Sequence, residues 1–188
     1  ESAGQIQLDS QTQQRDVIVV CEHEQLEGRD SLPHPEKVRS VKEDFTRVAV
    51  LKKVNVEKAA VAIFFNDTFG GRSPQDADAR TVLGALTLEK MCPQVHTCAE
   101  IASLESEPHL RMGKVDEVVV SGELAGSLLA QAALDVVGAR ILQVLISPSN
   151  DCNLKIAPVP PDQIGKTFSE ILSGYHANTG MIPVAVMS

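Results

Sequence analysis

The chain has 188 residues, a length typical of one domain with room for a small second lobe. Hydrophobic residues make up 43% of the chain and aromatic residues only 3%, so its core must be built from aliphatic side chains, as in parallel sheets buried under helices. The formal net charge is −8 and no basic cluster stands out, which argues against nucleic acid and anionic membrane surfaces as partners.

Short apolar runs bounded by turn residues predict a series of strands up to residue 120. In chain order, these strands are expected at residues 17–20, 38–41, 60–65, 95–99 and 118–120. Helical patterns are found at residues 1–14, 47–54, 73–91, 103–114, 123–134 and 139–146. Because strands and helices alternate, the sequence predicts an α/β fold with a Rossmann-like, mostly parallel sheet and helices on both faces.

Two of these helices have recognisable start signals. The helix after the strand at 60–65 should begin at Ser73, whose hydroxyl can cap backbone N–H groups, and Asp76 favours the positive end of that helix. For the helix at 47–54, Thr46 or Asp44 is the expected cap.

Residues 123–146 break the alternation, because two helices follow each other with no strand between them. Each helix has an apolar stripe, made of Leu124, Leu128 and Leu129 on the first and of Ile141, Leu142 and Leu145 on the second. Such a hairpin can bury its stripes in its own chain or in a partner, and periodicity favours neither.

The chain is expected to divide into three parts. These are an N-terminal lobe (1–121), a helix–turn–helix element (122–147) and part of a small α+β lobe (148–188). In the last part, strands are expected at 154–158 and 182–187 and a helix near 168–172.

Glu22 follows the strand at 17–20. An acid at this place in a dinucleotide-binding fold accepts the hydroxyl groups of an adenosine ribose, but here no G-x-G-x-x-G precedes it. The alternative is a solvated acid at a strand end. Asn66, after the strand at 60–65, and Arg80, in the following helix, are further candidates for nucleotide contacts, and a surface salt bridge is the alternative for Arg80.

Asp67 and Glu100 also lie at strand ends. Neighbouring parallel strands bring their carboxyl ends to one edge of a sheet, where ligands bind. These two acids are therefore candidates to share a hard cation such as calcium, which takes about six to eight oxygen ligands. Two solvated acids are the alternative.

The order of these pieces resembles the domain called regulator of conductance of potassium, or RCK, and the related TrkA-type subunits. The matching stretches, which span residues 17 to about 172, are "VIVVCEHE", "VRSVKEDFT", "VLKKVNVEKAAVAIFFND", "DADARTVLGALTLEKMCPQVHTCAEI", "VDEVVVSGELAGSLLAQAALD" and "LKIAPVPPDQIGKTFSEI". The resemblance implies that a first strand and its glycine turn stand upstream of residue 1, and that the C-terminal lobe is cut short near Ser188. It also adds Asp44 to the nucleotide candidates, although "EDFT" replaces the family's "GDPT" or "GDAT" near the adenine.

A resemblance to RCK domains further implies a function. The chain would be a ligand-sensing regulatory domain of a prokaryotic potassium channel, on the cytoplasmic face of the membrane and joined to a pore domain of the same or a partner chain. It would dimerise through the helical hairpin and assemble into a tetrameric or octameric ring. The implied ligands are Ca²⁺ or another divalent cation, and an adenine nucleotide or NAD(H). In some channel RCK domains the calcium site includes two acids after the strand that corresponds to residues 95–99. This chain has Glu100 and Ala102 at these two positions, and Glu105 is a candidate to replace the missing second acid.

Two other functions stay open at this stage. A soluble TrkA- or KtrA-type subunit of a potassium transporter would have the same fold. An NAD-dependent oxidoreductase would need a substrate domain, for which the residues after the hairpin are too few. Because no nucleophile with a base is recognisable, we expect no enzymatic activity. The four cysteines lack a C-x-x-C spacing and indicate reduced thiols in a cytoplasmic compartment.

Overall fold

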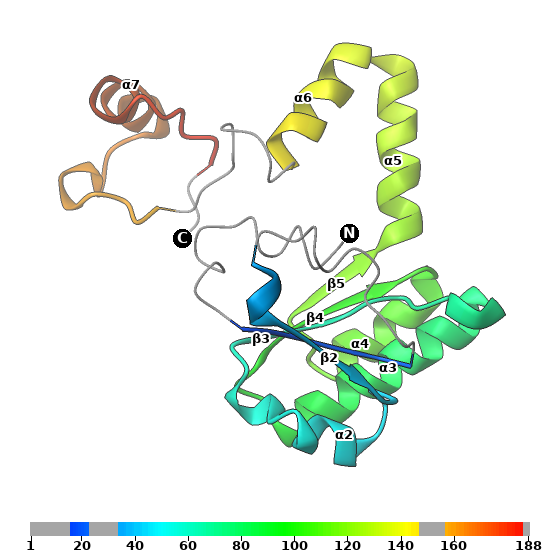
Figure 1. The fold of residues 1–188 in the computed structure, drawn as a ribbon. Coiled ribbons are helices and arrows are strands. Elements are labelled where there is room, and N and C mark those ends of the chain that lie inside the picture. The colour runs from blue at the N-terminus through cyan, green and yellow to red at the C-terminus, as the bar shows by residue number, and fades with distance from the viewer. Residues whose placement is uncertain (1–15, 23–33, 147–156, 186–188) are drawn as a thin grey trace. The chain divides into compact units, whose positions relative to one another are not determined.

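A computed structural model describes residues 16–22, 34–146 and 157–185 (Figure 1). The chain separates into two compact units, the first ending at Asn153 and the second beginning at Leu154. The helix expected at 1–14 lies outside the described residues, as does most of the strand expected at 154–158.

The strands described in the first unit form two parallel sheets. One sheet pairs β1 (Val17–Cys21) with β2 (Val38–Lys42). The other has the order β3 (Val61–Phe64), β4 (His96–Ile101) and β5 (Glu117–Val120). Each predicted strand up to residue 120 is therefore present, and the α/β class with parallel pairing is confirmed.

Helices and short 3₁₀ turns connect the strands. The α-helices are α2 (Val48–Lys53), α3 (Pro74–Met91), α4 (Glu107–Met112), α5 (Ser121–Leu134), α6 (Val136–Ile146) and α7 (Phe168–Thr179). The 3₁₀ turns are η2 (Pro35–Lys37), η3 (Val56–Lys58), η4 (Phe69–Gly71), η5 (Leu104–Ser106) and η6 (Pro161–Gln163). None of the helices in the described ranges is long and apolar enough to cross a bilayer.

The two predicted helix caps have different outcomes. Ser73 caps α3, because its hydroxyl accepts a hydrogen bond from the backbone N–H of Asp76 at 3.1 Å. The predicted cap of α2 is wrong: α2 begins after Arg47 and has no side-chain cap. The Asp44 carboxylate instead accepts a hydrogen bond from the backbone N–H of Thr46 at 3.0 Å, which closes the turn between β2 and α2.

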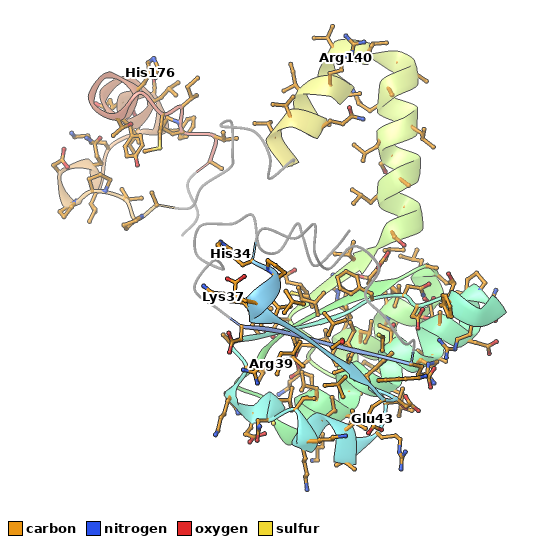
Figure 2. All side chains as sticks on the ribbon, viewed as in Figure 1. His34, Lys37, Arg39, Glu43, Arg140 and His176 are labelled. Atoms are coloured by element: carbon orange, nitrogen blue, oxygen red, sulfur yellow. The ribbon has the colours of Figure 1, made fainter. Side chains whose placement is uncertain are left out.

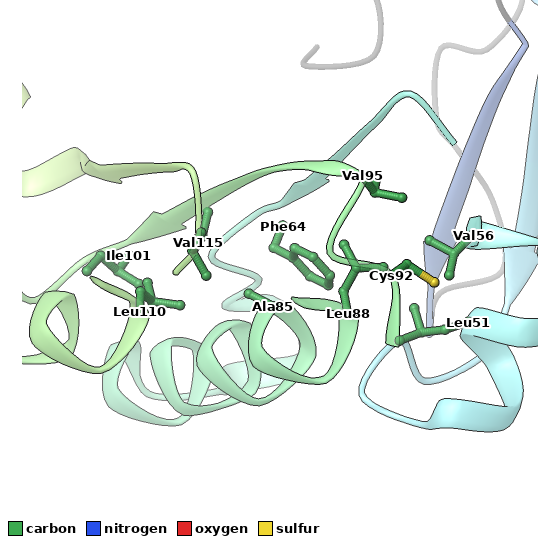
Figure 3. Close-up of a cluster of buried hydrophobic side chains, with 11 residues drawn as sticks. Leu51, Val56, Phe64, Ala85, Leu88, Cys92, Val95, Ile101, Leu110 and Val115 are labelled. Atoms are coloured by element: carbon green, nitrogen blue, oxygen red, sulfur yellow. The ribbon is translucent and has the colours of Figure 1, made fainter. Parts of the chain in front are cut away.

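The core lies between the β3–β4–β5 sheet and helices α3 and α4 (Figure 3). Its buried side chains are Leu51, Val56, Phe64, Ala85, Leu88, Cys92, Val95, Ala99, Ile101, Leu110 and Val115. They are almost all aliphatic, as the low aromatic content indicated. Side chains on the other face of the sheet are more accessible, since Val61, Ile63 and Phe65 are 42%, 40% and 43% exposed.

The second unit contains η6 and α7. Thr167 and Glu170 form a capping box at the start of α7, and Gly180 ends the helix with a left-handed φ of 71°. The helix predicted near 168–172 is therefore present and continues to Thr179. Residues 181–185 contain no strand, in contrast to the strand predicted at 182–187.

Candidate functional site

Charged side chains gather at the carboxyl edge of the two sheets. Glu22 follows β1, Asp44 follows β2, Asp67 follows β3 and Glu100 lies within β4. Parallel pairing brings these strand ends to one edge, where α/β sheets hold their ligands.

Arg72 links the two sheets, although the sequence did not single it out. Its guanidinium pairs with the carboxylate of Glu22 and lies 2.9 Å from Oδ2 of Asp67. The residue stands between η4 and the start of α3, directly after Gly70 and Gly71, which have φ angles of 73° and 80°. Both angles fall in the left-handed region that glycine adopts readily, so the turn can bring Arg72 back over the strand ends.

Arg80 makes a second set of contacts at the same edge. Its Nη2 atom lies 2.9 Å from Oδ1 of Asp44 and 3.4 Å from Oε2 of Glu22. Its guanidinium carbon lies 5.2 Å from the ring centroid of Phe45, a cation–π arrangement. Three of the four residues predicted to contact a nucleotide therefore lie together, and here they are paired with one another.

Asp44 is held in its charged form at neutral pH. Partial burial alone would raise the pKa of this carboxyl, but two hydrogen bonds from Thr46 and the guanidinium of Arg80 outweigh burial and leave its pKa below the ordinary value. The Thr46 hydroxyl donates at 2.8 Å and the Thr46 backbone N–H at 3.0 Å. A charged carboxylate in contact with a guanidinium makes a strong hydrogen bond.

Asn66 lies beside a different pair of acids. Its backbone N–H donates to Oε2 of Glu100 at 3.4 Å, and its side-chain amide donates to Oδ1 of Asp78. This fourth nucleotide candidate therefore connects the end of β3 to the acids of β4 and α3.

Asp78 is a site residue that the sequence analysis missed. Its side chain is buried, and its carboxylate accepts hydrogen bonds from the backbone N–H groups of Ala102 at 2.8 Å and Ser103 at 2.9 Å. The hydroxyl of Ser106 adds a contact of 3.3 Å. One signal in the sequence could have revealed Asp78: it lies three residues before Thr81, on the inner face of α3. A charged side chain on a buried helix face needs hydrogen-bonding partners, which marks it as a site residue.

The three residues predicted for a cation have different neighbours. Asp67 pairs with Arg72 and accepts a hydrogen bond from the backbone N–H of Phe69 at 3.0 Å. Glu100 contacts Asn66, and Glu105 is exposed within η5. Within the part of the chain that the structure describes, no three His, Cys, Asp or Glu side chains are arranged to hold a metal ion. The cation site stays a prediction.

The helical hairpin exposes its apolar stripes. Helices α5 and α6 contact each other, and their side chains can be followed in Figure 2, where Arg140 is labelled on α6. The exposed fractions are 52% for Leu124, 72% for Leu129, 55% for Ile141 and 42% for Leu142. An apolar groove of about 310 Å³ runs along α6, lined by Val137, Arg140, Ile141, Val144 and Leu145. Leu128 and Leu145 are half-buried.

Comparison with known proteins identifies the family. The model of the slowpoke-like RCK domain of calcium-activated potassium channels matches residues 6–99, half of the chain. The chain belongs to the slowpoke-like RCK family. The matched part of this RCK domain includes β1, β2 and β3 together with Arg72 and Arg80.

A curated relative adds a second match. The calcium-gated potassium channel TvoK of Thermoplasma volcanium is 29% identical to the RCK domain over 107 residues, which are 56% of this chain. The aligned part covers 31% of that channel, so the chain spans about a third of the relative's length.

Proposed function

We propose that the chain is the regulatory RCK domain of a calcium-gated potassium channel and that it acts on a pore at the cytoplasmic face of the membrane. The match of the slowpoke-like RCK model to residues 6–99 carries this proposal, and the similarity to TvoK supports it. The similarity to a channel favours a channel domain over a soluble transporter subunit. The role is regulatory and not enzymatic.

The ligand is a divalent cation, calcium in the first place, and its site lies at the ends of β3 and β4. Glu100 is the central ligand of this site, with Asp67 and Glu105 as the acids that join it. Binding requires Asp67 to leave Arg72, and Ala102 contributes no carboxylate. Because calcium affinity rises with the number of charged ligands, we expect a dissociation constant on the order of 1 mM.

A second copy of the chain covers the exposed stripes of α5 and α6. Helix α5 contains no buried residue among those described, and both helices present large apolar side chains to solvent. Exposed apolar surface of this kind marks an interaction site, and a self-complementary patch gives a symmetric dimer. Such dimers are the units from which a tetrameric or octameric gating ring is built.

Gating follows from a difference in ligand affinity between two arrangements of the ring. Shifting a two-state equilibrium from 1:99 to 99:1 takes about 5.5 kcal/mol of differential binding. A single weak cation falls short of this value, whereas several sites coupled in one ring reach it. A weak cation site can therefore control gating only when several copies of it are coupled in the ring.

Calcium binding can be tested by melting curves recorded at rising calcium concentrations. The melting temperature of the parent chain should rise with the logarithm of calcium concentration above the dissociation constant. Glu100→Gln should abolish the rise and Ala102→Glu should strengthen it, while Glu117→Gln, which removes an exposed acid in β5, should leave it unchanged. A parent curve that stays flat up to about 10 mM, with no gain from Ala102→Glu, would show that these acids bind no calcium.

A further inference from the structure

Asp78 is a buried acid whose oxygens are all engaged. Only 2% of its surface is exposed. Its Oδ1 atom accepts hydrogen bonds from the side-chain amide of Asn66 and from the backbone N–H of Ala102. Its Oδ2 atom accepts from the backbone N–H of Ser103 and from the hydroxyl of Ser106. A carboxylate offers about four lone-pair sites, which these donors fill, so Asp78 can act on a ligand only through the groups that it holds.

The first of these groups is the Asn66 amide, whose orientation is fixed. A carboxylate only accepts hydrogen bonds, so the amide must turn its NH₂ group toward Asp78. The amide oxygen of Asn66 then faces away from Asp78. The backbone N–H of the same residue lies 3.4 Å from Oε2 of Glu100. Asn66 is therefore a neighbour of Glu100 and has a carbonyl oxygen that Asp78 does not use.

The other groups belong to the chain that follows Glu100. Ala102 and Ser103 come directly after β4, and their backbone N–H groups lie 2.8 Å and 2.9 Å from the Asp78 carboxylate. One carboxylate on α3 thus holds the residue after β3 and the turn after β4. The position of Asn66 relative to Glu100 depends on it.

We propose that Asp78 is a positioning residue for calcium and that the amide oxygen of Asn66 is a further ligand beside Glu100, roles that rest on the calcium site proposed for the ends of β3 and β4. Calcium binds amide carbonyl oxygens as well as carboxylates. Asp67 must leave Arg72 before it can bind a cation, whereas Asn66 can bind one through its oxygen and keep its hydrogen bond to Asp78.

A neutral ligand agrees with the weak binding expected of this site. The amide of Asn66 adds an oxygen atom beside Glu100 without adding a second negative charge, and calcium affinity rises with the number of charged ligands. Groups that orient metal ligands affect metal affinity almost as much as the ligands do. Asp78 should therefore affect calcium affinity as well as the stability of the fold.

Calcium dissociation constants derived from melting curves test both roles. Each variant is compared with itself in the absence of calcium, so that a lower starting stability does not enter the comparison. Asn66→Ala should raise the dissociation constant about fivefold and Asp78→Asn about tenfold. Val95→Ala is the control, because Val95 is buried just before β4, at the end far from Glu100. It should lower the melting temperature and leave the dissociation constant unchanged.

The variant Asn66→Asp distinguishes a ligand from a residue with only a structural role. The new carboxylate would lie against that of Asp78, so the calcium-free protein should melt at a lower temperature. The same carboxylate adds a charge to the ligands around calcium, so the dissociation constant should fall about fivefold. A purely structural role for Asn66 predicts lower stability without tighter calcium binding.

The outcomes separate these roles from the calcium site itself. If calcium stabilises the parent chain but Asn66→Ala or Asp78→Asn keeps the parent's dissociation constant, the roles are refuted and the calcium site stands. The roles are also refuted if Val95→Ala raises the constant as much as they do, or if Asn66→Asp binds calcium no more tightly than the parent. If Asp78→Asn does not fold, the two Asn66 variants decide. A parent chain and an Asn66→Asp variant that both fail to respond to calcium would refute the site and the roles together.

Discussion

Asp78 shows at the scale of a single residue how this domain fixes its ligand edge. Its buried carboxylate receives hydrogen bonds from Asn66, from two backbone N–H groups after β4 and from Ser106. It therefore sets the path of the chain beyond Glu100. Sequence patterns predicted the acids at strand ends, but not this one, because its role depends on donors that lie 12 to 28 residues away in the chain.

Asp78→Asn should destabilise the protein strongly. The amide of asparagine accepts with one atom only and turns an NH₂ group toward backbone donors, so at least one buried donor loses its partner. We expect the free energy of unfolding to fall by about 2–4 kcal/mol, measured by urea denaturation. Asp76→Asn, at an exposed position of the same turn, should lower it by no more than about 1 kcal/mol. A change below about 0.5 kcal/mol for Asp78→Asn would contradict the assigned role.

Asp44 should make a measurable contribution to acid sensitivity. Its pKa is lower in the folded state than in the unfolded state, so its stabilising effect is complete above the ordinary carboxyl pKa of about 3.9 and is lost as the pH falls through the folded value. Asp44→Asn should therefore reduce the loss of stability between about pH 5 and pH 3, by less than about 1 kcal/mol. Denaturant unfolding at the two pH values measures it. Glu57→Gln, an exposed change, is the control, and an equal reduction in both variants would count against the Arg80 and Thr46 contacts.

At the scale of elements, the hairpin of α5 and α6 differs from the rest of the first unit. Helices α3 and α4, which cover the β3–β5 sheet, both place residues in the core, whereas among the described residues α5 buries none and α6 buries only Ala139. The sequence analysis predicted both helices and both stripes, and left open whether the stripes are buried within the chain. That could not be read from periodicity, because a helix facing its own core and a helix facing a partner have the same pattern.

Polar substitutions on the hairpin should separate the two copies. Leu128→Glu combined with Leu142→Glu places charges in the proposed interface, and sedimentation at about 50 µM should then show a monomer where the parent chain shows a dimer. Met112→Glu, at a side chain of α4 that is 78% exposed, should leave the dimer intact. A parent chain that sediments only as a monomer would refute the interface.

At the scale of the whole molecule, composition and alternation were sufficient for the parallel α/β class, and the succession of motifs for the RCK family. These features did not predict which charged side chains form ion pairs with one another at the strand ends. Glu22 and Arg80 were chosen as nucleotide contacts from their positions in the predicted fold, and Asp44 from the resemblance to RCK domains. The structure brings the three together as ion pairs. Arg72 escaped notice because an arginine in a glycine-rich loop has no periodic signal, and only the folded turn places it between two acids.

Potassium flux is the most direct test of the central claim that this domain lets calcium control a potassium pore. The native protein that contains the chain would be reconstituted into liposomes, and flux recorded as calcium is raised on the side facing the domain. We expect calcium to change the flux by about tenfold or more, and Glu100→Gln to remove most of that response. Potassium flux that is the same with and without calcium, or no potassium flux at all, would contradict the account.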